Sequence, residues 1–76
     1  MAEPLMILME NSIQIAWDYL ERTGELRDPE VASLVLLDAV ERMVRQGVRS
    51  RLVLSNKAIT AYQKFKKLEK VKLVPA

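Results

Sequence analysis

Turn-forming residues are scarce in this chain, which has two Gly and three Pro among its 76 residues. Because Gly and Pro supply many of the special backbone angles of turns, the chain has little material for loops. Half of the residues are hydrophobic and 5% are aromatic, which fits a helical core of Leu, Val, Ile, Met and Ala better than a β-sandwich. We therefore predict an all-α fold, a small three-helix domain over residues 1–76, with frayed ends at 1–4 and 70–76.

The clearest helix boundary in the sequence is the run Asp28-Pro29-Glu30. Asp28 can cap free backbone N–H groups, Pro29 suits the first helical position, and Glu30 complements the positive end of the helix dipole. Further along, Gly47 stands where a left-handed C-terminal cap is expected. These signals predict a helix over residues 29–46.

Two further helices flank this one in the sequence. A first helix over residues 4–23 is predicted from polar residues that recur at spacings of three, four and seven, and Gly24 ends it. A third helix over residues 55–69 begins at Ser55, a residue type that caps helix N-termini well. We expect the acidic first helix to lie near the basic third helix.

Two stretches of the chain are ambiguous. Residues 48–54 hold Val53 between Leu52 and Leu54, a short apolar run that is compatible with an extended or irregular segment between the second and third helices. Residues 70–74 alternate in part, so they could pair with that segment, continue the third helix or fray. The sequence leaves these alternatives open.

Charged residues are sorted along the chain. Residues 1–41 contain nine Asp or Glu and two Arg, whereas residues 42–76 contain one Glu and ten Lys or Arg. Asymmetry of this kind lets the two halves attract each other, a second copy of the chain or an acidic partner.

The basic half could also contact the phosphate groups of a nucleic acid. The candidate contacts are Arg49, Arg51, Lys57, Lys64, Lys66, Lys67 and Lys70. About eight residues separate the second and third predicted helices, which is longer than the turn of about three to four residues in a helix-turn-helix motif. The alternatives are that these cations form a solvated face that complements the acidic first helix, or that they contact an anionic membrane surface or an acidic protein.

Apolar residues cover wide arcs of the first two predicted helices. An amphipathic surface helix needs an apolar face of about 100°, and three short helices cannot easily bury much more. We therefore predict a homodimer or a docking face for another protein, because Met adapts to partners and Trp anchors interfaces. The candidate contact residues are Met6, Met9, Ile13, Trp17 and Leu37. The alternative is that the second helix is the central helix of a monomer and is buried on two sides.

The chain has no Cys and no His. Their absence argues against disulfides, thiol nucleophiles and the usual zinc or haem ligands. We find no catalytic, cofactor-binding or metal-binding motif, and we expect neither an enzyme nor a small-molecule substrate. No run of about 20 apolar residues and no export-signal pattern is present, so we expect a cytoplasmic protein without a membrane span. The sequence thus predicts a non-enzymatic, homodimeric protein-interaction module, with nucleic-acid binding or a transcription-accessory role as the alternative.

Overall fold

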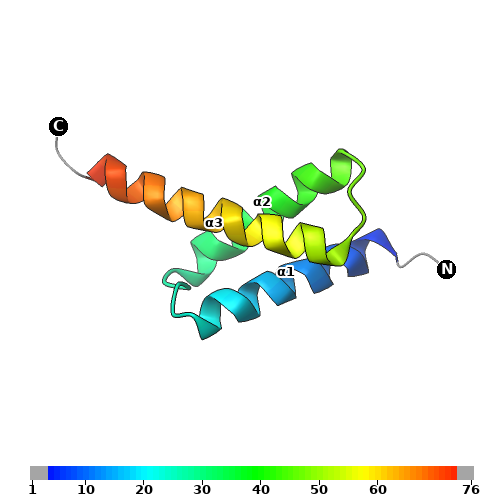
Figure 1. Cartoon of the computed structure of the whole chain (residues 1–76), viewed down its shortest axis with the longest axis horizontal. Helices are drawn as coiled ribbons and strands as arrows, with labels where there is room; N and C mark the ends of the chain where they lie inside the picture. The colour runs from blue at the N-terminus through cyan, green and yellow to red at the C-terminus, as the bar shows by residue number, and fades with distance from the viewer. Residues whose placement is uncertain (1–3, 74–76) are drawn as a thin grey trace.

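The computed structural model describes the backbone of residues 4–73 and the side chains of residues 4–68. This part of the chain forms three helices: α1 (Leu5–Arg22), α2 (Pro29–Arg45) and α3 (Arg51–Leu73). The predicted all-α, three-helix fold is therefore confirmed. In Figure 1, α1 and α3 run side by side in the same direction, and α2 runs back obliquely behind α3. The C-terminal turns of α3 project beyond the other two helices.

The core is built from one stripe of buried side chains on each helix. Within a stripe most of the buried residues recur every three or four positions, and α2 and α3 each add one adjacent pair, so they share one face of the helix. The stripes are Leu8, Ser12, Ala16 and Leu20 on α1, Ala32, Leu36, Val40, Met43 and Val44 on α2, and Leu54, Ser55, Ala58 and Tyr62 on α3. Several of these side chains are small, which lets the helix backbones approach closely. Because α3 packs against both α1 and α2, the acidic first helix lies beside the basic third helix.

Gly24 and Gly47 end α1 and α2, as the sequence predicted. Both have a positive φ, of 76° and 98°, in a region that Gly enters without strain because it has no Cβ. After α2, the Gly47 N–H donates to the carbonyl of Val44 and the Val48 N–H donates to the carbonyl of Met43, each at 3.0 Å. This is the Schellman pairing, which satisfies carbonyls that the helix itself leaves without partners.

Replacing Gly47 with Ala is expected to lower the free energy of unfolding by about 1–2 kcal/mol, because an L-residue is strained in the left-handed region. Backbone strain is the whole effect, since a Cβ at this position would meet nothing within 4 Å. Urea unfolding followed by circular dichroism measures the change. Gln46→Ala is the control, because Gln46 is exposed and has an ordinary φ of −82°. A Gly47→Ala protein as stable as the parent would show that this turn relaxes into another conformation.

The bounds predicted for the first two helices, 4–23 and 29–46, lie within one residue of the structure. Asp28 caps α2, because its carboxylate accepts a hydrogen bond from the Val31 N–H at 3.4 Å. Pro29 occupies the first helical position, where its missing N–H costs nothing.

The start of α3 differs from the prediction. An extended or irregular segment over residues 48–54 is wrong from Arg51 onward, because α3 begins there. Ser50 provides the cap, since its hydroxyl accepts from the Val53 N–H at 3.3 Å and its carbonyl accepts from the Leu54 N–H at 2.9 Å. The helix therefore starts four residues earlier than the sequence indicated.

Burial of Leu54 gives the physical reason for this earlier start. In the helix, Leu54 shares a face with Ala58 and Tyr62, and all three are buried. An extended segment would place Leu52 and Leu54 on the same face, whereas Leu52 is 69% exposed and Leu54 is 0% exposed. Ser55, the predicted cap, lies inside the helix instead, and its hydroxyl donates to the carbonyl of Leu52 at 3.1 Å.

The end of α3 also lies beyond its predicted position at residue 69. Of the three alternatives for residues 70–74, the structure shows a continued helix up to Leu73. Pro4 precedes α1, and residues 1–3 and 74–76 lie outside the described part of the chain.

The connection between α1 and α2 is fastened to α3 through Glu25. Tyr62 as a whole residue is 1% exposed, and its hydroxyl donates to the backbone carbonyl of Glu25 at 3.3 Å. The side-chain amide of Gln63 donates to the Glu25 carboxylate at 3.0 Å. The Thr23 hydroxyl donates to the other oxygen of that carboxylate at 2.6 Å. One loop residue thereby joins the end of α1 to the middle of α3.

Candidate interaction surfaces

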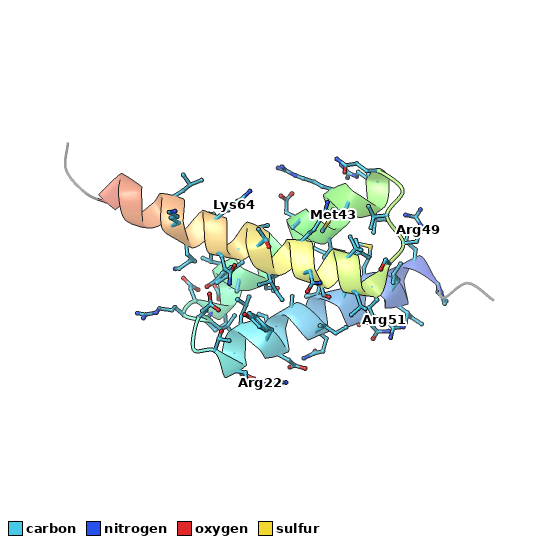
Figure 2. The ribbon with its side chains drawn as sticks, in the orientation of Figure 1. Arg22, Met43, Arg49, Arg51 and Lys64 are labelled. Atoms are coloured by element: carbon cyan, nitrogen blue, oxygen red, sulfur yellow. The ribbon has the colours of Figure 1, made fainter. Side chains whose placement is uncertain are left out.

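A groove of about 660 Å³ runs between α2 and α3, and no residue of α1 lines it. We call it the α2/α3 groove. Its apolar lining residues are Leu34, Val35, Ala39 and Met43 of α2 and Ala61, Phe65 and Leu68 of α3. Figure 2 shows Met43 between α2 and α3, and Lys64 projecting from α3 on the same side. The groove is thus formed by side chains of two helices that come together only in the folded chain.

Three large apolar side chains remain exposed in the α2/α3 groove. Leu34 is 68% exposed, Leu68 is 66% exposed and Phe65 is 36% exposed. Beneath them, Val35 and Ala39 are half-buried and pack against the core, which holds the floor of the groove in place. Large apolar side chains gathered in one concave surface are typical of interaction sites, whereas single exposed apolar residues are common on any protein.

Basic residues border this apolar surface. Arg42 contacts Asp38 through its Nε atom at 3.1 Å, and both side chains are more than half exposed. Such exposed ion pairs contribute about 1 kcal/mol or less to stability, so this pair holds the rim only loosely. Lys57 and Lys64 add two further cations to the lining. The rim is therefore net positive around an apolar floor.

The five residues predicted for a protein interface lie outside the α2/α3 groove. Met6 is 75% exposed and Leu37 is 42% exposed. Met9, Ile13 and Trp17 are half-buried, with one side packed against the core. Two of the five line a shallow hollow of about 400 Å³ on α1. The residues of that hollow are Glu10, Asn11, Ile13, Gln14 and Trp17.

The residues predicted for nucleic-acid contact are spread over the molecule. Lys57 and Lys64 border the α2/α3 groove. Arg49 lies in the connection before α3, where its guanidinium donates to the carbonyl of Val44 at 2.8 Å and so supports the end of α2. Figure 2 shows Arg49 and Arg51 near the start of α3, well separated from Lys64.

Lys66 and Lys67 lie on other parts of the surface. Lys66 is half-buried and lines a small hollow beside Tyr62 and Gln63. Lys67 is exposed and is not part of the groove. The side chain of Lys70 lies outside the described residues. The structure thus brings together Lys57 and Lys64, with Arg42 beside them, and places Arg49, Arg51, Lys66 and Lys67 outside the groove.

Sequence reasoning missed the groove as a site. The signal that was available is the excess of apolar residues on the second helix, which is wider than one packing face requires. Which flank of each helix meets the other is decided by the tertiary packing.

The described residues contain no group of three or more Asp or Glu side chains placed to hold a metal ion. No helix within that range is long and apolar enough to cross a membrane. The chain matches no protein-family model, no curated protein and no solved structure. A functional proposal therefore rests on the exposed apolar side chains and the charged residues of the α2/α3 groove and of α1.

Proposed function

We propose that this protein is a non-enzymatic protein-interaction module and that the α2/α3 groove is its binding surface. The observation that supports this proposal is the exposure of Leu34, Phe65 and Leu68 within one concave surface. Covering these side chains with another apolar surface would remove them from water, which is the main driving force of protein association.

The α2/α3 groove is long enough to hold a short helix. Its lining extends from Leu34 to Gln46 on α2 and from Lys57 to Leu68 on α3. These spans are about 16–18 Å long at a rise of about 1.5 Å per residue, which is about three helical turns. An amphipathic helix that lays its apolar face into a groove of this length is a recurring mode of recognition between proteins.

The basic rim favours a partner with acidic residues at the edges of its apolar face. Lys57 and Lys64 stand on the α3 side of the groove, and Arg42 stands on the α2 side beside Asp38. Charges at the rim of an interface select partners and steer their approach more than they add affinity. The apolar floor would supply the affinity, and the rim would supply the selectivity.

Nucleic-acid binding is the second function that the charge asymmetry suggested. Successive residues of an α-helix are turned by about 100°, so Lys67 lies about 60° from Lys64, whereas Lys66 points about 160° away from Lys64. Phosphate contacts that position a protein on a duplex need cations on one face. Arg42 and Lys57 do share a surface with Lys64, but they surround exposed apolar side chains. A protein partner therefore fits this surface better.

A synthetic amphipathic helical peptide of about 16 residues, with Leu on one face and Glu on the other, is expected to bind the α2/α3 groove. Binding should shift the backbone amide resonances of Val35, Ala39 and Ala61 in an NMR titration. A matched peptide with Lys in place of every Glu should bind at least about tenfold more weakly, because its charges face the basic rim.

Two variants of the protein make this titration specific. Leu68→Asp should weaken binding of the acidic peptide by about tenfold or more, because it places a carboxylate in the apolar lining. Leu52→Asp is the matched control, because Leu52 and Leu68 lie on the same helix and are 69% and 66% exposed, but only Leu68 lines the groove. Equal effects of the two changes, or no binding of either peptide, would contradict the proposal.

A further inference from the structure

We infer that the partner seated in the α2/α3 groove is α1 of a second copy of the same chain. This inference rests on the proposed function, because it needs the groove to be a protein-binding surface. It is argued from two separate surfaces of the molecule. One is the apolar groove with a basic rim on α2 and α3, and the other is an apolar edge with acidic residues on α1.

The apolar edge of α1 is made of residues spaced three and four apart. Met6 is 75% exposed, and Ile13 and Trp17 are half-buried with part of each side chain at the surface. Glu10 and Glu21 alternate with them along the same line and are exposed. We call these five residues the acidic edge. Residues at such spacings lie on one side of a helix, so the edge presents apolar and acidic groups together.

The two surfaces carry opposite charge. Among the lining residues of the α2/α3 groove, three cations outnumber the one carboxylate, that of Asp38. The acidic edge carries the carboxylates of Glu10 and Glu21. Two grooves facing each other would place their basic rims together, which is unfavourable, whereas groove and edge attract. The charge asymmetry of the sequence thus becomes complementarity between two copies.

The lengths of the two surfaces also agree. From Met6 to Glu21 the acidic edge rises about 22 Å along α1, of which Met6 to Trp17 covers about 16 Å, and the groove lining extends about 16–18 Å along α2 and α3. Trp17 and Met6 are residue types that anchor interfaces or adapt to them. The edge is therefore long enough to extend along the whole groove lining, with Glu21 near one end.

The contact joins two different surfaces. If two copies each insert α1 into the groove of the other, the dimer is two-fold and isologous; if they do not, the contact is heterologous and further copies add in a ring or chain. The charge-exchange experiment described next applies to both arrangements, because it tests which surfaces meet and not how many copies assemble.

Two double variants test the pairing. Glu10→Lys with Glu21→Lys makes the edge basic, and Lys57→Glu with Lys64→Glu makes the groove acidic. All four residues are exposed, so the fold should be retained. We expect the parent protein to associate in sedimentation equilibrium, less at high salt, and each variant alone to associate at least about tenfold more weakly.

An equimolar mixture of the two variants should recover association to within about threefold of the parent, because every groove then meets an edge of opposite charge. Lys67→Glu is the control for general charge effects, since Lys67 is exposed on α3 outside the groove, and it should leave association unchanged. A mixture that associates no better than either variant alone overturns the inference, as does a parent protein that stays monomeric at millimolar concentration.

The acidic peptide described above separates the two proposals. If the variant mixture stays monomeric while the peptide still binds and shifts Val35 and Ala39, the groove serves a different acidic partner and only the second-copy inference fails. If the peptide also fails to bind, the proposed function fails with it. Recovery of association in the mixture together with binding of the peptide supports both.

Discussion

Leu54→Ala lowers the free energy of unfolding by about 2–5 kcal/mol, whereas Leu52→Ala lowers it by about 0.5 kcal/mol or less. Leu54 is 0% exposed in the core between α3 and its neighbours, so truncation leaves a cavity that the surrounding side chains fill only in part. Leu52 is 69% exposed, and truncation there removes little buried surface. The two changes are chemically identical and lie two positions apart, which makes each a control for the other.

Urea unfolding followed by circular dichroism and by Trp17 fluorescence measures both changes. A domain of this size has only a few kcal/mol of stability, so Leu54→Ala can leave the chain unfolded in water. Leu54→Val, with an expected loss of about 1 kcal/mol, keeps the comparison measurable in that case. Similar losses at both positions would mean that the two side chains share one face, as they would in an extended segment, and would contradict the helical start of α3.

The helix ends are the part of the fold that local sequence predicts well. Gly24 and Gly47 occupy left-handed positions, and Asp28 caps α2, because these features depend on a few neighbouring residues and on backbone geometry. The start of α3 depends on more than that. Two serines, Ser50 and Ser55, compete as caps in the sequence, and the burial of Leu54 against other helices selects the earlier one.

The interaction surfaces also combine features that local sequence predicts with features that tertiary packing decides. An excess of apolar residues on the second helix was visible in the sequence, and so was the need for something to cover it. The sequence could not show that the flank with Leu34 meets the flank with Phe65 and Leu68, because this depends on how α2 crosses α3. One result could have been foreseen: a helix turns about 100° per residue, so Lys66 points about 160° away from Lys64, although Lys67 is only about 60° from Lys64.

Tyr62→Ala is expected to lower the free energy of unfolding by about 3–5 kcal/mol, and Tyr62→Phe by about 1 kcal/mol. The ring of Tyr62 is 1% exposed, and Tyr62 is the largest fully buried side chain in the described core, so its removal leaves a large cavity. The milder change removes only the hydroxyl, which leaves the Glu25 carbonyl without the hydrogen bond that it accepts at 3.3 Å.

The difference between the two variants separates packing from hydrogen bonding. Tyr19→Phe is the matched control, because Tyr19 is 44% exposed and loss of its hydroxyl should change the stability by less than about 0.5 kcal/mol. Hydrogen exchange adds a local measurement: in Tyr62→Phe, protection of the amide of Leu26, which donates to the Leu20 carbonyl at 3.2 Å, should fall more than that of the amide of Leu54. Equal loss of protection at both amides would mean that the hydroxyl stabilises the whole bundle. Loss of protection confined to the Leu26 amide would mean that the two parts of the Tyr62 side chain have separate roles: the ring stabilises the core, and the hydroxyl stabilises the α1–α2 connection.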